Sequence, residues 1–388
     1  MTNRNQIVIT HVWEQPVLIY MENDKIYDVI FGEENREHIE VGDIYIGKVQ
    51  NIVHNINAAF VEVKKGTLCY LSLNEIAHGK KIKCGDELVV QVTKAAVKTK
   101  QPVVSLSPEV AGRYVVVSTR TGKKTFSKKI VDQNRCKELQ QLLNEFSDEE
   151  YGLVLRTNAQ TAKDEDIMAE CHRLLSEVHE QMEKSKFLTC FSLVRKEDSF
   201  YKKYLNSCKW EDIHRIITDE KDIYEELCQM CGDIVQFYQD DNYPMDKLFG
   251  ITSKLEKALE KRVWLKSGGY LVIEPTEALT VIDVNTGKAI DGKRNKETTF
   301  YKINSEAALE AARQIRMRNL SGIILIDFID MNKKENQDNL MALLREELNK
   351  DKTKTTLVDI TKLGLVEITR MKKNRPLSCY VRKKENGL

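Results

Sequence analysis

The chain reads Leu-Thr-Val-Ile-Asp-Val-Asn over residues 279–285 and Ile-Ile-Leu-Ile-Asp-Phe-Ile-Asp over residues 323–330. Short apolar runs of this kind are typical of strands buried on both faces of a parallel sheet. An ionised carboxylate is costly within such a strand, but the C-terminal end of a strand opens on the crevice where α/β sheets hold ligands. We therefore expect Asp283 and Asp327 to lie side by side. Two carboxylates this close repel each other unless a cation lies between them.

The sequence around these strands predicts an α/β region over residues 195–388. Strands are expected within 210–218 and at 270–274 and 356–360, and helices at 222–239, 245–261, 304–319 and 335–348. The alternation of strands and helices favours a mainly parallel sheet with right-handed crossovers. At the other end of the chain, strand-like runs at 6–10, 17–20 and 26–30 predict a β-meander within residues 1–39 that needs a partner elsewhere to bury its face.

Residues 40–106 form a run of short strand-like segments punctuated by glycines, which predicts a small Greek-key barrel of the OB type. The segments at 47–49, 57–61 and 70–73 resemble an S1-type RNA-binding domain. In that case Phe60 and Tyr70 form a base-stacking platform, and three lysines neutralise phosphates, namely Lys94, Lys98 and Lys100. The alternative is that Phe60 belongs to the core of the barrel.

Residues 107–194 mix expected strands at 114–117 and 152–155 with helices at 136–143 and 164–184. A basic loop spans residues 120–129. Arg156 and Thr157 directly follow a strand, and an arginine beside a hydroxyl makes a good phosphate clamp because the guanidinium reaches two oxygens. Such a pair is common, so on its own it identifies no site.

Composition limits the classes of protein that need considering. A chain of 388 residues exceeds one core and indicates two to four domains. Lys and Arg total 60 against 59 for Asp and Glu, so any affinity for nucleic acid must come from local basic patches. Nine scattered cysteines, no signal-peptide pattern and no run of membrane-spanning length favour a cytoplasmic protein with reduced thiols and no membrane partner.

Three stretches, at residues 268–287, 322–331 and 364–370, closely resemble the catalytic domain of the ribonuclease E/G family. The resemblance extends upstream to the S1-like barrel and to the Gly-Leu-Val-Leu-Arg-Thr segment at 152–157, so it covers most of the chain. It implies an α/β multidomain fold. An S1-type barrel (40–106) and a 5′-end sensor (107–194) would be inserted in an RNase H-like subdomain (1–39 and 195–262). A DNase I-like catalytic subdomain (263–375) and a basic tail (376–388) would follow.

The resemblance implies that Asp283 and Asp327 hold one Mg²⁺ and that Asn285 supports the first aspartate. Strand alternation puts Asn285 on the same face as Asp283, where it can orient the carboxylate. A few hard oxygen ligands suit Mg²⁺, which keeps most of its waters. Asp330 is the fallback ligand, although we expect it to cap the next segment. The alternative for the pair is that both aspartates are helix N-caps.

The resemblance also implies a pocket for the 5′ end of RNA in residues 107–194. In the family an Arg-Thr pair and a nearby Gly-x-x-x-Val segment hold a 5′-monophosphate. The matching residues here are Gly112, Val116, Arg156 and Thr157, with Lys128 expected nearby. A small pocket would favour a monophosphate over the bulkier triphosphate.

The chain departs from the family pattern near its end. Family members often carry a Cys-Pro-x-Cys element that binds Zn²⁺ between two subunits, whereas only Cys379 is present here. We therefore expect no zinc, and a homodimer, if formed, without a zinc link. Cys228-x-x-Cys231 could be half a zinc site or a redox pair, but we expect packed thiols. The seven histidines show no ligand spacing, and no P-loop is present.

The sequence thus predicts a Mg²⁺-dependent endoribonuclease that cleaves single-stranded RNA, in the processing or decay of ribosomal or messenger RNA. Family behaviour implies products with a 5′-phosphate and a 3′-hydroxyl. Two other interpretations stay open at this point. One is a catalytically inactive RNA-binding or assembly factor with the same fold, and the other is a purely structural α/β protein.

Overall fold

The computed structural model describes residues 5–32, 39–76, 81–96, 100–120, 122–146, 150–287 and 296–381. The chain forms two compact units, one made of residues 1–34 and 211–388 and the other of residues 35–210. The first unit is therefore discontinuous in the sequence. No helix in the described ranges is both long enough and apolar enough to cross a membrane.

The first unit contains a five-stranded sheet in the order β15-β14-β1-β2-β3. Its strands are β1 (Asn5–Val12), β2 (Gln15–Glu22), β3 (Lys25–Phe31), β14 (Arg215–Thr218) and β15 (Val235–Phe237). The first three strands are antiparallel neighbours, which confirms the predicted meander. β14 lies parallel to β1, and β15 lies parallel to β14. The partner that the meander needs thus comes from the distant residues 215–237.

Two helical predictions in this unit extend too far. The helix expected at 222–239 ends early as α4 (Lys221–Cys231), because Gly232 takes a positive φ of 65° and the chain then forms β15. The helix expected at 245–261 is two helices, α5 (Met245–Phe249) and α6 (Ile251–Ala258), separated by Gly250 at φ 58°. Met245 and Leu255 of these helices are fully buried in the core beneath the meander.

A second sheet of the first unit has six strands in the order β16-β17-β18-β19-β21-β20. Its strands are β16 (Arg262–Trp264), β17 (Tyr270–Pro275), β18 (Leu279–Asn285), β19 (Gly322–Asp327), β20 (Thr355–Ile360) and β21 (Val366–Arg370). Only β18 and β19 run parallel, so the prediction of a mainly parallel sheet is wrong. The reason is loop length: residues 276–278 between β17 and β18 are too few for a crossover and form a hairpin instead.

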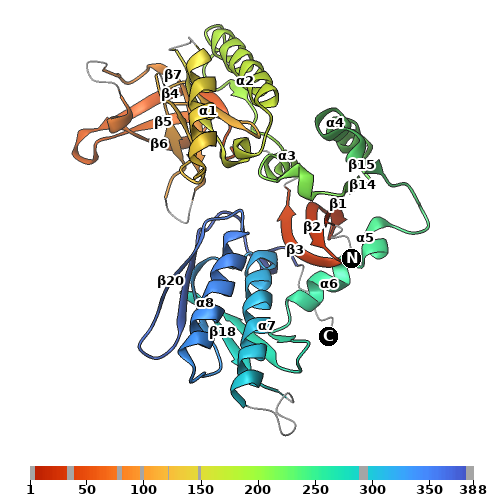
Figure 1. Ribbon diagram of the computed structural model, residues 1–388. Coiled ribbons are helices and arrows are strands. Elements are labelled where there is room, and N and C mark those ends of the chain that lie inside the picture. Colours follow the sequence, from red (N-terminus) through yellow and green to blue (C-terminus); the bar gives the residue numbers. More distant parts are fainter. Residues whose placement is uncertain are drawn as a thin grey trace, which may run out of the picture. The chain divides into compact units, whose positions relative to one another are not determined.

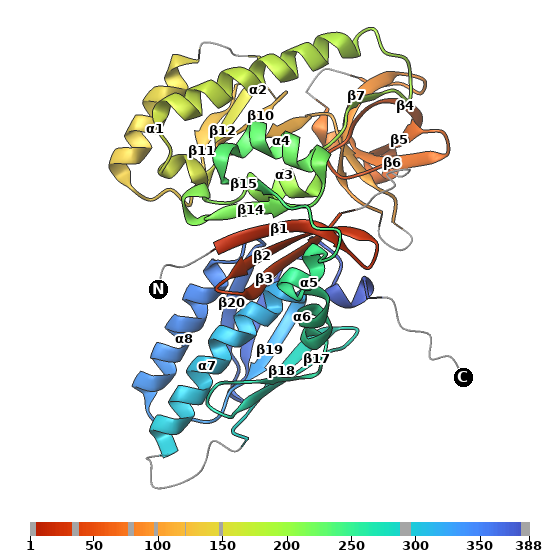
Figure 2. The same ribbon diagram turned by 90° about the vertical axis from the view of Figure 1, so that its right-hand side faces the viewer.

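Helices α7 (Lys296–Met317) and α8 (Lys334–Asn349) lie side by side along this six-stranded sheet (Figures 1 and 2). They bury Ile282 and Val284 of β18 and Ile324 and Ile326 of β19. The residues between these alternate outward, and Ile323 is 50% exposed. The prediction that these strands are buried on both faces is therefore wrong, because the described helices of this unit pack on one face of the sheet. We call the other face, which carries residues 281, 283, 285, 323 and 327, the open face.

The second unit contains a closed five-stranded barrel in the order β4-β5-β6-β8-β7, closed by pairing of β4 with β7. The strands are β4 (Ile44–Val53), β5 (Ala58–Lys64), β6 (Thr67–Ser72), β7 (Glu87–Lys94) and β8 (Val103–Ser105). This confirms the OB-like barrel predicted from the sequence. Ala59, Val61 and Leu71 are fully buried inside it.

The second unit also contains a four-stranded sheet in the order β11-β12-β10-β9, on which two helices pack. The elements are β9 (Glu109–Ala111), β10 (Val115–Ser118), β11 (Lys124–Phe126), β12 (Gly152–Leu155), α1 (Gln133–Glu145) and α2 (Asp164–Ser185). Leu139 and Leu143 of α1 and Cys171 and Leu174 of α2 pack with the strands in one core. Figure 2 shows α1 and α2 beside β10, β11 and β12.

Candidate active site and RNA-binding surfaces

Asp283 and Asp327 lie directly opposite each other on the two parallel strands β18 and β19. Neighbouring strands are about 4.8 Å apart, and residues in register point to the same side of a sheet. The two carboxylates are therefore neighbours on the open face, at the C-terminal ends of their strands. Asp327 is exposed and Asp283 is half-buried. Parallel pairing of these two strands is what brings together two residues that are far apart in the sequence.

Asn285 holds the carboxylate of Asp283 in place. Its side-chain amide Nδ2 donates a hydrogen bond of 2.6 Å to Asp283 Oδ2. The two residues are separated by one position of β18, so both project onto the open face. The bond fixes the orientation of the aspartate, which is the role that a residue supporting a metal ligand performs.

The electrostatics of the site favour a cation. Burial raises the pKa of Asp327, and the neighbouring Asp283 and then Asp330 raise it further. A carboxylate whose pKa is raised by neighbouring negative charge is stabilised in its ionised form when a positive ion binds beside it. Asp330 is thus close enough to act on Asp327 as a further negative charge.

The helix-cap interpretations fail. Helix α8 has Lys333 as its N-cap residue and no side-chain capping bond, so the prediction that Asp330 caps the next segment is wrong. Neither strand-end aspartate directly precedes a helix, because α7 begins at Lys296 and α8 at Lys334. The backbone N–H groups just before α8 are instead satisfied by Glu297 of α7, which accepts from Asn332 at 3.1 Å and from Lys333 at 3.0 Å.

Asn304 of α7 positions the loop that follows Asp327, and the sequence interpretation missed it. This fully buried side chain donates to the Ile329 carbonyl at 2.7 Å and accepts from the Ile329 N–H at 3.0 Å. The signal in the sequence was one amide on a helix face that otherwise carries Ala307, Ala308 and Ala311. A buried amide must find hydrogen-bond partners, and here they are backbone groups beside the active site.

The donor set fits Mg²⁺ better than Zn²⁺. It consists of carboxylate oxygens that are few and partly exposed, which suits an ion that keeps most of its waters. Within the described ranges, no group of three or more His, Cys, Asp or Glu residues is placed to hold a metal. Cys228 and Cys231 lie in the last turn of α4 and are half-buried, and Cys379 is exposed.

The barrel carries the predicted stacking residues on its outer surface. Phe60 and Tyr70 are register partners with ring centroids 6.4 Å apart and planes at 80°. Both are half-buried, whereas Ala59 and Val61 on either side of Phe60 point inward. The interpretation of Phe60 as a core residue is therefore wrong.

Register links these rings to a lysine. Tyr70 pairs with Val103, and Val103 pairs with Lys94, so the lysine and the two rings belong to one row across the barrel. Lys94 and Lys100 are exposed, and Lys98 lies outside the described residues. Aromatic rings beside a cation are the combination that single-stranded nucleic acids bind.

In the second unit's four-stranded sheet, the structure brings most of the predicted phosphate-binding residues together. The Arg156 guanidinium donates to the Gly112 carbonyl. Thr157 Oγ1 lies 3.1 Å from Ser127 Oγ, and the exposed Lys128 follows Ser127 in the chain. These contacts join Gly112, which follows β9, to Arg156 at the end of β12, and place Thr157 beside the residue that precedes Lys128.

Glu170 of α2 is a further residue of this region that the sequence did not reveal. Its carboxylate accepts hydrogen bonds from three successive backbone N–H groups, those of Arg113 (2.9 Å), Tyr114 (2.6 Å) and Val115 (3.1 Å). A Cβ on Gly112 would lie 2.6 Å from the Glu170 carboxyl carbon, so the contact requires glycine.

Glu170 also affects Arg156. Burial lowers the pKa of Arg156, and the charge of Glu170 opposes this shift. Val116 follows the segment that Glu170 holds and pairs with Val154 of β12, two residues before Arg156. The structure therefore places Val116 near this group of residues but not at its centre.

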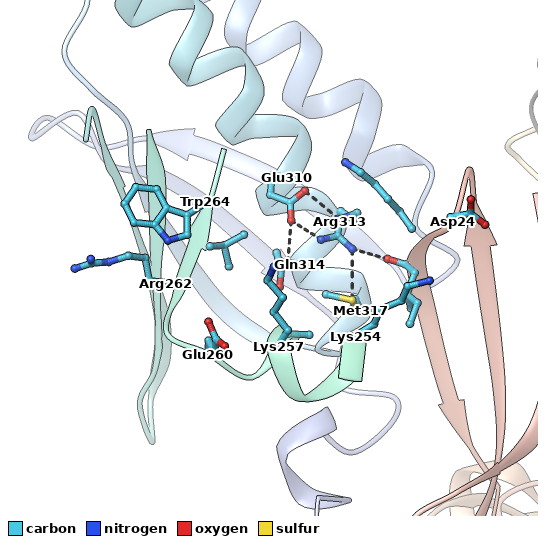
Figure 3. A pocket seen from close by; sticks show the side chains of 14 residues that line it. Asp24, Lys254, Lys257, Glu260, Arg262, Trp264, Glu310, Arg313, Gln314 and Met317 are labelled. Atoms are coloured by element: carbon cyan, nitrogen blue, oxygen red, sulfur yellow. Dashed lines mark hydrogen bonds and ion pairs between the residues drawn. The ribbon is translucent and has the colours of Figure 1, made fainter. Parts of the chain in front are cut away.

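A pocket of about 350 Å³ lies elsewhere in the first unit, between the β2–β3 turn, α6, β16 and α7 (Figure 3). The charged side chains at the centre of the pocket form ion pairs and hydrogen bonds with one another. Arg313 pairs with Glu310 and donates to the Ile26 carbonyl at 2.7 Å, and Gln314 donates to Glu310 at 2.8 Å. The described lining includes none of the residues of the aspartate pair. We regard this network as structural, because it joins α7 to the meander.

Comparison with known proteins gives a consistent result. A family model described as the Ribonuclease E/G family matches residues 109–373. Ribonuclease G of Salmonella typhimurium (strain SL1344) is 30% identical over 375 residues, covering 90% of this chain and 76% of the relative. Ribonuclease G of Haemophilus influenzae is 31% identical, covering 87% and 73%. Ribonuclease E of Nostoc sp. is 30% identical, covering 95% of this chain and 56% of the relative.

Proposed function

Because this chain belongs to the Ribonuclease E/G family and is an endoribonuclease, we propose that it cleaves single-stranded RNA in a Mg²⁺-dependent reaction at Asp283 and Asp327. The observation that carries the proposal is the register of the two parallel strands, which sets these carboxylates opposite each other. The alternation that buries the intervening residues turns both side chains onto the open face, where a polymer can reach them.

Asp283 and Asp327 would hold the ion, and Asn285 would fix the orientation of Asp283 through its 2.6 Å bond. When bound, Mg²⁺ supplies Lewis-acid polarisation of the phosphate and lowers the pKa of water. The protein contributes positioning. Asn304 holds the loop after Asp327 through two hydrogen bonds to Ile329. The Asp327 carboxylate therefore does not have to be ordered during the reaction. We propose products with a 5′-phosphate and a 3′-hydroxyl.

We further propose that the barrel binds the RNA strand. Phe60 and Tyr70 would stack with bases, and Lys94 and Lys100 would contact phosphates. Support comes from the outward direction of both rings and from the row that they form with Lys94. Each stacked base contributes about 1–3 kcal/mol and depends little on sequence, which suits an enzyme that handles many RNAs, such as ribosomal and messenger RNA.

A preference for 5′-monophosphorylated ends is proposed for Gly112, Val116, Lys128, Arg156 and Thr157. Arg156 is anchored to the Gly112 carbonyl, and Thr157 contacts Ser127 next to Lys128. An anchored guanidinium loses less freedom when it binds a phosphate. The subdomain names expected above, RNase H-like for the meander sheet and DNase I-like for the six-stranded sheet, belong to this proposal as well.

The test is cleavage of a 5′-monophosphorylated oligoribonucleotide with Mg²⁺, with EDTA, and with Mg²⁺ restored. We expect cleavage only when the ion is present. D283N and D327N should each abolish cleavage and leave RNA binding nearly intact, whereas D359N, an exposed aspartate of β20, should cleave normally. Retained activity in D283N or D327N would refute the metal assignment. Wild-type binding without cleavage would favour the inactive RNA-binding factor.

A further inference from the structure

Three side chains outside the proposed active site share its face of the sheet. Trp264 of β16 pairs with Tyr270 of β17, and Tyr270 pairs with Asn285 of β18. Arg262 lies in the next outward row, opposite Val272, which pairs with Asp283. Because register partners point to the same side of a sheet, these three side chains lie on the open face.

Figure 3 supports this direction. Arg262 and Trp264 project to the side of their strand that faces away from Glu310, Arg313 and Gln314 of α7. The residue between them, Val263, packs against the core on the helix side. Arg262 and Trp264 both border the pocket of Figure 3 at this edge strand, and both are exposed.

The three side chains pack against one another. The rings of Trp264 and Tyr270 have centroids 5.2 Å apart, with planes at 58°. The Arg262 guanidinium carbon lies 4.5 Å from the centroid of Tyr270 and 5.8 Å from that of Trp264. Cation–π contacts of this kind hold aromatic rings in place and leave a guanidinium that can also bind phosphate.

Trp264 is unusually exposed for so large an apolar side chain, at 59%. Tryptophan is highly buried on average, so a purely structural role accounts poorly for a ring that leaves most of its surface in water. An exposed tryptophan beside an arginine is the combination on which unpaired bases stack.

The distances suit an RNA strand that runs through the active site. Strand spacing places the Tyr270 Cα about 8 Å from that of Asp283, and the Trp264 Cα one strand farther at about 12 Å. A phosphate at the aspartate pair would therefore have the base of a neighbouring nucleotide within reach of Trp264.

We propose that Trp264, Tyr270 and Arg262 form a base-stacking subsite on the catalytic sheet that holds a nucleotide next to the phosphate to be cleaved. The inference rests on the proposed function, because it takes the aspartate pair as the place of cleavage. Stacking tolerates any base, so the subsite positions the strand and does not select a sequence. Trp264 is thus a positioning residue.

Kinetics with abasic substrates test the role directly. The substrate is a 5′-monophosphorylated oligoribonucleotide with one cleavage site, compared with versions that carry one abasic nucleotide at each flanking position. We expect an abasic nucleotide at one flanking position to lower wild-type kcat/KM by about 5- to 150-fold. W264A should show the same loss on the intact strand and no further loss with that abasic strand.

Two variants control for folding. W264F keeps an aromatic ring and should retain most of the activity. Y243A removes another exposed aromatic residue of the same unit and should behave as wild type. If W264A matches wild type on intact RNA, or loses the same factor on every abasic strand, the subsite is refuted, because the second result is what a structural defect would give.

A binding measurement separates this inference from the proposed function. Oligoribonucleotide should quench tryptophan emission in the wild type. The quench should be lost in W264F, which keeps the other two tryptophans, Trp13 and Trp210. Quenching at Trp264 without any cleavage would refute the proposed function and, with it, the link of the subsite to cleavage, and would leave only the stacking of RNA on Trp264. Emission that changes with protein concentration and not with RNA would place a second copy on this face and overturn the inference.

Discussion

Replacement of Asn285 by alanine tests how the active site is held together. Asn285 donates a 2.6 Å hydrogen bond to the carboxylate of Asp283, and this bond is charge-assisted if the aspartate is ionised. Such a bond contributes about 1.5–3 kcal/mol, which corresponds to about a 10- to 150-fold change in rate. Loss of a residue that orients a metal ligand typically costs 10- to 100-fold, so the two estimates agree.

The assay is single-turnover cleavage of a 5′-monophosphorylated oligoribonucleotide over a series of Mg²⁺ concentrations. N285A should cleave about 10- to 100-fold more slowly at low Mg²⁺, and the concentration that gives half of the maximal rate should rise. Because N285A removes one hydrogen bond of a half-buried side chain, its free energy of unfolding should fall by no more than about 1.5–3 kcal/mol. N242A, an exposed asparagine of the same unit, is the matched control. Wild-type rates with unchanged Mg²⁺ dependence in N285A would refute the proposal that Asn285 orients a metal ligand.

The other predictions concern the barrel, the 5′ end and stability. F60A should weaken binding of single-stranded RNA by about 5- to 150-fold in a titration, and unchanged affinity would remove Phe60 from the RNA surface. R156A should erase any preference for monophosphate over hydroxyl 5′ ends in competition cleavage, and a persisting preference would contradict the sensor. E310A should lower the free energy of unfolding by about 3 kcal/mol at pH 7, because it leaves Arg313 buried without its ion pair, whereas E274A, from an exposed pair, should change it little.

The pH dependence of the Glu310 contribution has a definite sign. Burial pushes the pKa of Glu310 up, but the hydrogen bond and charge of Arg313 outweigh it and hold the pKa below the ordinary value of 4.5. A depressed carboxyl pKa stabilises the folded state above the unfolded pKa, and this stability is lost as the pH falls. The difference in free energy of unfolding between E310A and wild type, measured in urea, should therefore become smaller below about pH 4.5. A constant difference would show that lost packing, and not charge, causes the change.

The sequence was sufficient to predict the aspartate pair because its signal is local. Each strand is a short β-branched run that ends in Asp, and one helix lies between them, so parallel pairing follows from elementary geometry. The direction of Asn285 follows from strand alternation. The outward direction of Phe60 was left open, because one ring in a barrel strand has no periodic signal of its own until the buried neighbours Ala59 and Val61 are known.

Other features depend on tertiary contacts that no window of sequence contains. β16 is three residues long and has no strand signal, so the face that carries Trp264 was not predicted. Glu170 looked like an ordinary charge on an exposed helix, yet it binds three backbone N–H groups of a segment more than 50 residues away. The mainly parallel sheet was wrong because loop length, and not strand composition, decides the direction of the next strand.

The central claim is that Asp283 and Asp327 share one divalent ion. Mn²⁺ titration of the folded protein, followed by electron paramagnetic resonance in the absence of RNA, tests this without reference to activity. We predict one site per chain in the wild type and in D359N, and its loss in both D283N and D327N. Binding of the ion with wild-type affinity in either of these two variants, with the fold intact, would contradict the account.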